Sequence, residues 1–340
     1  MNVELSSSLP VGSRAANRRG FYTTLGAIAL LLLASLIWAP SSLSSGAVAG
    51  MLPFAAVLAV VGLGQMLVVQ QAGFDLSAPG SISLSVVLIA YISYGDDSKI
   101  PLAIGVAFLC AIGAGLLNAL LIGWLNLSAI IATLGTNALL MGIILGVSGG
   151  VPRSSSGSIS AFTNSSVLGI PNSAIVAILV VALVGLVLKK TAAGRRFEAV
   201  GASSSVMKAA GVQTRVYKGA AYVGAQLLYA VAGTLLVGIV AQPTAYLGNS
   251  YLLPSVAVVV LAGTALSGGK GFPVATSLAA LFLTQLNQFT LALGVTSAAQ
   301  TLVQAFAFGV GVAIYSVDWK RLIEKLPGVA RENRAVPAPV

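Results

Sequence analysis

Eight carboxamide side chains interrupt the apolar runs of this sequence, and they are its first candidates for binding a solute. A polar side chain inside an apolar run is costly unless it faces a cavity or another helix. Amide and hydroxyl linings suit a neutral, sugar-like polyol, because a charged solute would favour an opposite charge in the runs. The alternative for each residue is a hydrogen bond between helices. The eight candidates are Gln65, Gln70, Asn118, Asn137, Gln242, Gln285, Asn287 and Gln288.

Titratable groups are scarce in the apolar runs, which limits the chemistry that the chain can do. The sequence has no histidine, which excludes triads, metal sites and proton relays built on imidazole. A carrier driven by protons usually holds Asp, Glu or His within its spans. The acidic residues here fall at boundaries, in loops or in tails: Glu4, Asp75, Asp96, Asp97, Glu198, Asp318, Glu324 and Glu332. We therefore predict a non-catalytic chain without a metal or cofactor of its own, powered by another subunit. The alternative is an ion-coupled carrier of a small polar solute, in which backbone carbonyls and hydroxyls hold sodium.

A basic segment between two long apolar runs is the second candidate site. Seven of the 18 basic residues lie from Lys189 to Lys218, and only Glu198 opposes them. Small residues at positions 199–205 let another surface approach closely, and residues 206–211 are predicted to form a short helix closed by a C-terminal glycine. We predict that this segment docks a soluble partner. The simpler alternative is that its charge only orients the chain in the membrane.

A glycine-rich stretch, "GTALSGGKGF" at residues 263–272, has some features of a phosphate-binding loop. The P-loop pattern requires G-x-x-x-x-G-K-[ST]. Thr264 stands where the first glycine belongs, and Gly271 stands where the metal-binding hydroxyl belongs. We predict a break between helices and no nucleotide site.

Composition places most of the chain in a membrane. Apolar residues make up 57% of the 340 residues and charged residues 8%, and the mean hydropathy is +0.97. About 20 helical residues cross a hydrocarbon core of roughly 30 Å. We predict an all-α polytopic protein with about ten transmembrane helices, in which the single Cys110 serves helix packing. The predicted runs are residues 21–38, 51–70, 80–94, 101–124, 128–147, 173–188, 219–240, 254–267, 272–293 and 297–317.

Basic residues orient the predicted helices. With the N-terminus inside, only Lys99 and Arg153 of the 18 Lys and Arg residues fall outside. The net charge of +10 is therefore a topology signal and does not indicate nucleic-acid binding. Both termini are predicted to be cytoplasmic. The predicted regions are a tail at residues 1–20, a transmembrane domain at 21–317 with an external loop at 148–172 and a cytoplasmic loop at 189–218, and a tail at 318–340.

The first apolar run also has features of a cleavable secretory signal. Arg14, Arg18 and Arg19 precede it, and the small-residue stretch "GAVAG" follows it. The apolar region of a secretory signal has about 7–15 residues. The run at residues 21–38 is long enough to span, so we expect it to remain as a membrane anchor.

Two short runs and the order of the others indicate a repeated architecture. The runs at residues 80–94 and 254–267 are short for straight crossings, so we expect broken or partial helices there. Four runs within residues 51–147 start outside, and four within 219–317 start inside, each set with a glycine-rich or serine-rich break after an early run. This order predicts an inverted repeat. Asp75 is expected to cap a broken helix or to pair locally, with contact to a solute as the lesser alternative.

Four ordered motifs resemble the permease subunits of ABC importers of ribose and other monosaccharides, within the binding-protein-dependent branched-chain amino acid and sugar permease family. The first, "TAAGRRFEAVGASSSVMKAAGV", is similar to the cytoplasmic pattern of that family. The others are "QAGFDLSAPGSISL", "VVVLAGTALSGGKG" and "IIATLGTNALLMGIILGVSGG", and together they cover nearly the whole chain. Residues that match the cytoplasmic pattern are Thr191, Gly194, Arg195, Phe197, Ala199, Gly201, Ala209 and Gly211. Residues that match the second motif are Gly73, Asp75, Leu76 and Ser77.

The resemblance implies a complex in the bacterial plasma (inner) membrane. It implies two permease chains, identical or sister chains, two cytoplasmic ATPase subunits that bind ATP and Mg²⁺, and an extracytoplasmic solute-binding protein. Asp96 and Asp97, expected outside, could meet a basic patch on the binding protein, or they form a solvated turn. Where relatives carry Asn-x-x-Ala-Ala-Arg, this chain has Ser204, Ser205 and a Met207-Lys208 pair, and Ala78 and Pro79 replace a usual Val-Gly. The implied ATPase-coupling residues are Gly194, Arg195, Glu198, Gly201, Ala202, Lys208, Ala209 and Gly211.

Overall fold

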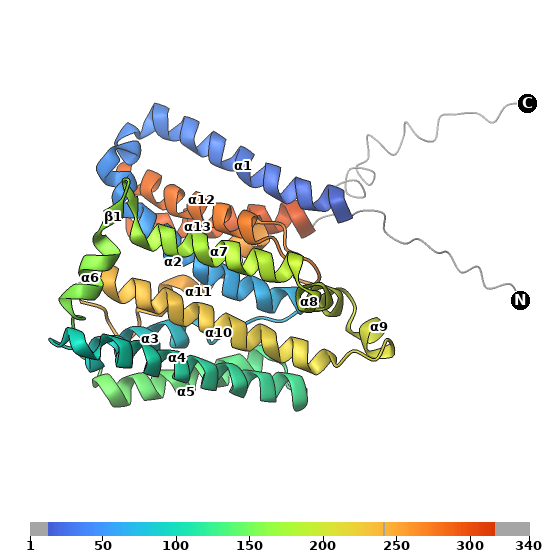
Figure 1. Cartoon of the computed structure of the whole chain (residues 1–340). Coiled ribbons are helices and arrows are strands. Elements are labelled where there is room, and N and C mark those ends of the chain that lie inside the picture. Colours follow the sequence, from blue (N-terminus) through green and yellow to red (C-terminus); the bar gives the residue numbers. More distant parts are fainter. Residues whose placement is uncertain (1–12, 241, 317–340) are drawn as a thin grey trace, which may run out of the picture.

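The computed structural model describes residues 13–240 and 242–316, and the described chain is almost entirely helical (Figure 1). The helices are α1 (Ser13–Trp38), α2 (Ser45–Gln70), α3 (Ala78–Ile92), α4 (Ile100–Asn118), α5 (Ala129–Ser148), α6 (Gly157–Asn164), α7 (Asn172–Lys190), α8 (Ala192–Ala202), α9 (Ser204–Ala209), α10 (Thr214–Ile239), α11 (Leu252–Leu261), α12 (Pro273–Ala292) and α13 (Ser297–Ser316). Short turns are η1 (Pro40–Leu43), η2 (Asp97–Lys99), the π-helical η3 (Ala119–Trp124) and η4 (Leu247–Tyr251). A small hairpin, β1 (Ser166–Val167) and β2 (Ile170–Pro171), precedes α7.

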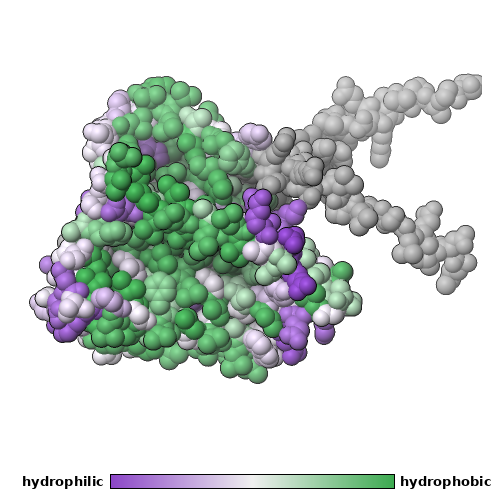
Figure 2. Space-filling model, viewed as in Figure 1, coloured by the Kyte–Doolittle hydropathy of each residue, from purple (hydrophilic) through white to green (hydrophobic). Residues whose placement is uncertain are grey.

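Apolar helices form a broad belt around the molecule. In the described part of the chain, six segments are long and apolar enough to cross a membrane: Phe21–Trp38, Ser45–Gln70, Asp97–Trp124, Ala129–Ser148, Asn172–Lys190 and Thr214–Ile239. Two shorter apolar segments, Ala78–Ile92 and Leu247–Leu261, lie where the sequence predicts broken helices. The last two predicted runs form α12 and α13. Hydrophilic residues gather toward two ends of the molecule in Figure 2, with the apolar band between them.

Basic side chains distinguish the two ends of the bundle. One end carries α6 and the hairpin, and it holds Lys99 and Arg153. The other end carries α8 and α9 (Figure 1). Because Lys and Arg prefer the cytoplasmic side, the α8–α9 end is the one that we expect to face the cytoplasm. We call these the outer end and the inner end. Basic residues at the inner end are Lys189, Lys190, Arg195, Arg196, Lys208, Arg215, Lys218 and Lys270.

One predicted boundary shifts, at the start of the first apolar run. α1 begins at Ser13, inside the predicted N-terminal tail, because the Ala and Arg residues before the run favour helix. The outer loop holds the short helix α6 and the hairpin. The predicted C-terminal tail lies outside the described residues.

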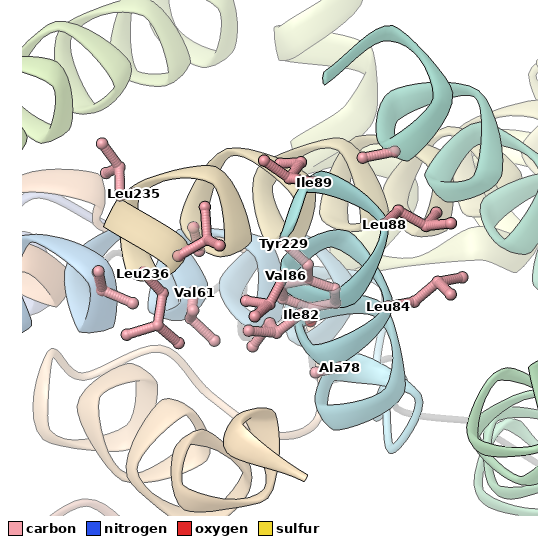
Figure 3. Packing of buried hydrophobic residues seen from close by; sticks show 14 of the residues in the cluster. Val61, Ala78, Ile82, Leu84, Val86, Leu88, Ile89, Tyr229, Leu235 and Leu236 are labelled. Atoms are coloured by element: carbon pink, nitrogen blue, oxygen red, sulfur yellow. The ribbon is translucent and has the colours of Figure 1, made fainter. Parts of the chain in front are cut away.

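α2 and α10 cross in opposite directions at the centre of the bundle. A Cβ atom on Gly64 would press on the ring of Tyr229, and one on Gly73, just beyond α2, would press on the hydroxyl of Tyr222. As the chain runs from Gly64 to Gly73, its contacts in α10 move back from Tyr229 to Tyr222, so the two segments are antiparallel. Both tyrosines are buried, and in Figure 3 the ring of Tyr229 lies among apolar side chains of α3 such as Ile82. This crossing forms the core around which the other helices pack.

The packing around these two helices repeats in reverse. α2 packs against α11 and α12, and α10 packs against α3 and α4. α3 packs against α4 and α5, as α11 packs against α12 and α13. These contacts of α2 and α3 therefore have counterparts in those of α10 and α11.

α3 and α11 are half-helices that begin inside the bundle. After the inner end of α2, the chain returns through residues 71–77 and starts α3, which runs to the outer end. After the outer end of α10, residues 242–251 return inward, and α11 runs to the inner end. The second returning segment meets α3, because the N–H of Gly248 donates to Oγ of Ser83 at 2.9 Å. A Cβ atom on Gly248 would overlap the carbonyl oxygen of Pro79, so only glycine permits this approach.

Candidate functional site

The segment that returns from α2 to α3 carries a buried carboxylate. Asp75 has no exposed surface, and its Oδ1 accepts hydrogen bonds from the N–H of Ser77 at 2.9 Å and from the Ser77 hydroxyl at 2.5 Å. Its Oδ2 accepts from Nε2 of Gln226, halfway along α10, at 3.1 Å. The predicted local pairing of Asp75 beside a broken helix is confirmed. Asp75 lies in a loop, as predicted, but this loop folds back into the bundle and buries the carboxylate.

A hydrogen-bond network extends from this carboxylate to four helices, α3, α4, α5 and α10. Nε2 of Gln226 also donates to Oγ of Ser77 at 2.8 Å, and Oε1 of Gln226 accepts from the hydroxyl of Ser81 in α3. Nδ2 of Asn118, at the end of α4, donates to Oγ of Ser77 at 3.0 Å. Oγ1 of Thr136 in α5 donates to Oδ1 of Asn118 at 2.6 Å. We call Asp75, Ser77, Ser81, Asn118, Thr136 and Gln226 the break cluster.

The break cluster consists of groups suited to hydrogen bonding. Apart from Asp75, its side chains are hydroxyls and carboxamides, which keep their charge state near neutral pH. In the part of the chain that the structure describes, no group of three or more His, Cys, Asp or Glu side chains is placed to hold a metal ion. The cluster therefore holds the returning segment in one position against α4, α5 and α10.

A cavity of about 270 Å³ opens beside the second returning segment. Apolar side chains of α2, α10 and α12 form part of its wall, including Phe54, Leu236 and Leu283. Oδ1 of Asn287 accepts a hydrogen bond from Nε2 of Gln304 at 2.5 Å inside this lining. The polar residues of the lining are Ser250, Tyr251, Thr284, Asn287 and Gln304. This mixture of uncharged donors, acceptors and apolar surface can bind a small hydroxylated solute.

Five of the eight predicted carboxamides lie in helix packing. Asn118 belongs to the break cluster, and Oε1 of Gln65 accepts from the Tyr229 hydroxyl at 3.0 Å. Oδ1 of Asn137 accepts from the N–H of Gly80 at 2.9 Å. Nε2 of Gln285 lies 3.3 Å from Oγ of Ser35 in α1 and 3.4 Å from Oγ of Ser42 in η1. Gln70 is fully buried at the inner end of α2.

The remaining three predicted carboxamides lie toward the surface. Asn287 is exposed and lines the 270 Å³ cavity. Gln288 is half-buried beside it, and Gln242 is exposed after the outer end of α10. Of the eight predicted carboxamides, Asn287 is the one that lines this cavity.

Sequence reasoning missed Gln226, the central member of the break cluster. It lies within an apolar run, so the signal that selected the other carboxamides would also have selected it. Ser77, Ser81 and Thr136 gave no such signal, because hydroxyls are common in membrane helices and bond to their own backbone.

The predicted short helix at the inner end is present as α9. Val206 on α9 is 64% exposed, and the helix ends in a left-handed turn at Gly211, whose φ is +78°. The N–H of Gly211 donates to the carbonyl of Lys208 at 3.0 Å, and the N–H of Val212 donates to the carbonyl of Met207 at 3.0 Å. This pair of bonds is a Schellman C-cap, which satisfies the last carbonyls of the helix. α9 therefore projects as an ordered, exposed turn.

Glycines fix α8 against the transmembrane helices. A Cβ atom on Gly194 would overlap the carbonyl oxygen of Val187 at the end of α7. One on Gly201 would overlap the carbonyl oxygen of Gln70, which accepts from the N–H of Gly269 at 2.9 Å. We call the contact of Gly201, Gln70 and residues 268–271 the glycine junction. α8 thus touches both the end of α2 and the break after α11.

The other predicted coupling residues lie around α8 and α9. Arg195 is exposed, and Glu198 is half-buried. Burial raises the pKa of Glu198, and the charges of Lys270 and Lys189 oppose that rise. Exposed positions at the tip are Ala202, Lys208, Ala209 and Gly211.

Charged residues at the outer end are held by local contacts. Asp96 accepts from the N–H of Ser98 at 3.0 Å and pairs with Lys99 at 3.3 Å, and its hydrogen bond from the Ser98 hydroxyl is the main cause of its lowered pKa. A hydrogen bond from Ser158 of α6 likewise lowers the pKa of Asp97. These acids therefore order the outer turns that they occupy.

Arg153 anchors the start of the outer loop. Its guanidinium lies 4.5 Å from the ring centre of Tyr91 and 4.3 Å from that of Tyr94. The Tyr91 hydroxyl in turn donates to the carbonyls of Ser148 at 2.9 Å and Val151 at 2.7 Å. These contacts attach the loop to the end of α3.

Apolar helices that enclose two half-helices and a buried polar cluster define a multi-pass membrane transport protein. The profile of the family described as branched-chain amino acid transport system / permease component matches residues 47–314. The chain belongs to this family, and it is a permease subunit of an ABC importer in the bacterial plasma (inner) membrane.

Curated relatives cover nearly the same length of chain. The ribose import permease protein RbsC of Bacillus subtilis is 34% identical over 296 residues, 85% of this chain and 90% of the relative. The galactose/methyl galactoside import permease protein MglC of Escherichia coli is 27% identical over 332 residues, 90% of this chain and 99% of the relative. The probable ABC transporter permease protein y4mJ of Sinorhizobium fredii is 30% identical over 295 residues, 85% of this chain and 87% of the relative. No solved structure matches the chain significantly.

Proposed function

We propose that this chain forms the path for a neutral monosaccharide or sugar-like solute in an ATP-driven, binding-protein-dependent importer. The observation that carries the proposal is the 270 Å³ cavity, whose polar lining is made of uncharged hydroxyls and carboxamides. Sugar-import relatives at 27–34% identity support the solute class. ATP and Mg²⁺ are bound by a separate ATPase, an external binding protein delivers the solute, and a second permease chain, identical or a sister, completes the path.

Reconstitution with separate energy sources tests this proposal. The complete complex in liposomes, with the binding protein outside and ATP inside, is expected to accumulate labelled ribose or galactose. The chain alone, supplied with a proton or sodium gradient, is expected to accumulate neither sugar. Uptake by the chain alone would instead support the ion-coupled alternative.

The reciprocal packing of α2–α5 and α10–α13 supports an inverted repeat within one transmembrane domain at residues 21–317. In this proposal the chain makes ten crossings with both termini in the cytoplasm. Because α3 and α11 begin inside the bundle and run to opposite ends, each repeat contributes one half-helix to the centre.

The exposed turn α9 and the adjoining face of α8, within the loop at residues 189–218, are proposed to dock the ATPase. Replacing Val206 with glutamate puts a charge on the exposed side of this turn without touching Gly211. We expect ATP hydrolysis by the complex to continue while the sugar imported per ATP falls about tenfold, since a charge buried at an interface costs more than 1.4 kcal/mol. Uptake and phosphate release measured on the same liposomes give this ratio.

Val167→Glu is the matched control for Val206→Glu. Val167 is 56% exposed in the hairpin at the outer end, far from α9. It should leave the amount of sugar imported per ATP unchanged. Normal sugar uptake per ATP in Val206→Glu would remove α9 from the docking surface.

Asn287 is proposed to bind the solute in the 270 Å³ cavity. Asn287→Leu removes a donor and an acceptor at about 0.5–1.5 kcal/mol each, so we expect half-saturation of uptake to need roughly tenfold more binding-protein complex. Gln288→Leu changes the neighbouring carboxamide, which does not line this cavity. Equal effects of the two substitutions on sugar uptake would contradict the role of Asn287.

A further inference from the structure

A cavity of about 750 Å³ lies at the inner end, between the end of the span that contains α4 and the start of α10. It is separate from the solute cavity, which opens among α2, α10, α12 and α13. Trp124 and Asn126 line one wall, and α9 and the start of α10 line the other. The cavity therefore sits where two membrane spans meet the cytoplasmic boundary.

Three cations face this cavity. Lys208 comes from α9, and Arg215 and Lys218 come from the first turns of α10. Among the described residues that line the cavity, none is acidic. Their charge makes the cavity attractive to an anion.

Uncharged donors add to this attraction. Ser204, Ser205 and Thr214 bring hydroxyl groups to the lining, and Gln213 and Asn126 bring carboxamides. Gln213 is the N-cap of α10, so the positive end of the dipole of this long helix lies at the cavity lining. Phosphate oxygens accept hydrogen bonds from all of these groups.

Exposed apolar side chains stand at the rim of the cavity. Trp124 is 46% exposed and Val216 is 48% exposed, and both line the cavity. Leu125, next to Trp124, is 58% exposed. Tryptophan is typical of the membrane–water interface, where its ring lies at the level of the headgroups.

We propose that this cavity binds the headgroup of an anionic phospholipid of the inner leaflet. The three cations and the hydroxyl groups hold the phosphate, while Trp124, Val216 and Leu125 contact the start of the acyl chains. A soluble anion would use the cations but not the exposed apolar rim, so the rim favours a lipid. The site does not depend on which solute the chain transports.

Native mass spectrometry of the purified chain with added phosphatidylglycerol or phosphatidylcholine tests this proposal. We expect phosphatidylglycerol to bind preferentially, and the triple variant Lys208→Gln, Arg215→Gln, Lys218→Gln to bind it roughly hundredfold more weakly, since each cation strengthens the attraction to anionic lipid. Inorganic phosphate at equal concentration should compete poorly. Circular dichroism and gel filtration confirm that each variant is folded.

A second triple variant has the same charge loss at the same end of the molecule. Lys189, Lys190 and Arg195 are exposed but do not line the cavity, so their change to glutamine should preserve phosphatidylglycerol binding. Equal losses in both triple variants would show a diffuse charge effect and overturn the site. Unchanged lipid binding in the first variant, with loss of the ATPase on co-purification, would assign the cavity to the protein partner and also overturn it.

Discussion

Replacing Asp75 with alanine should destabilise the purified permease more than any other single change in the break cluster. Three buried donors, the N–H and hydroxyl of Ser77 and Nε2 of Gln226, bond to this carboxylate. Each buried donor left unpaired costs about 1–3 kcal/mol. We therefore expect a clear fall in the temperature at which half of the detergent-solubilised protein is lost from the monodisperse peak on gel filtration.

Two further variants separate the causes of this loss. Asp75→Asn keeps the bonds from Ser77 but presents an amide N–H to Nε2 of Gln226, which is also a donor. Oε1 of Gln226 already accepts from Ser81. The fall in this temperature should therefore be intermediate. Asp96→Ala removes a carboxylate at the outer end that contacts only neighbouring residues, so its fall in this temperature should be much smaller. Equal melting of Asp75→Ala and Asp96→Ala would show that the buried network contributes little to stability.

The second large effect is expected from Gly201→Val, at the glycine junction. A Cβ atom there overlaps the backbone carbonyl of Gln70, which cannot move aside as a flexible side chain could. α8 must then shift, and the bond from Nε2 of Gln71 to the carbonyl of Phe197 is lost. Overpacking of this kind costs about 1–3 kcal/mol, so uptake should fall roughly ten- to hundredfold if α8 transmits the ATPase movement.

Gly185→Val is the matched control on the neighbouring helix α7. No atom lies within 4 Å of a Cβ atom built there, so the added methyl groups meet open space. ATP-driven uptake should stay near that of the unmodified complex. If Gly201→Val supported the same uptake as Gly185→Val, transmission through the glycine junction would be refuted.

The helices were largely predictable from the sequence. Long apolar runs predict the spans, and the two short runs correctly indicated the half-helices α3 and α11. The glycine at position 211 correctly predicted the end of α9, because a left-handed residue there is a local requirement. These features depend on residues close together in the chain.

The candidate site was less predictable because it depends on contacts between distant residues. Asp75 follows a turn in the sequence, and nothing local shows that the turn folds back into the bundle. Its partner Gln226 lies 151 residues away. Gly201 was assigned to a docking surface from its small size, whereas its lack of a side chain serves close contact with α2. Pairings of this kind follow from helix packing and not from local pattern.

The hydrogen bond between Asp75 and Gln226 also constrains how the protein is made. When the ribosome has synthesised α2 and α3, the carboxylate has its Ser77 partner, but its partner in α10 does not yet exist. Similarly, Oγ of Ser83 in α3 accepts its hydrogen bond from Gly248, which is synthesised later. The N-terminal half therefore acquires these two hydrogen bonds only after the C-terminal half has entered the bilayer.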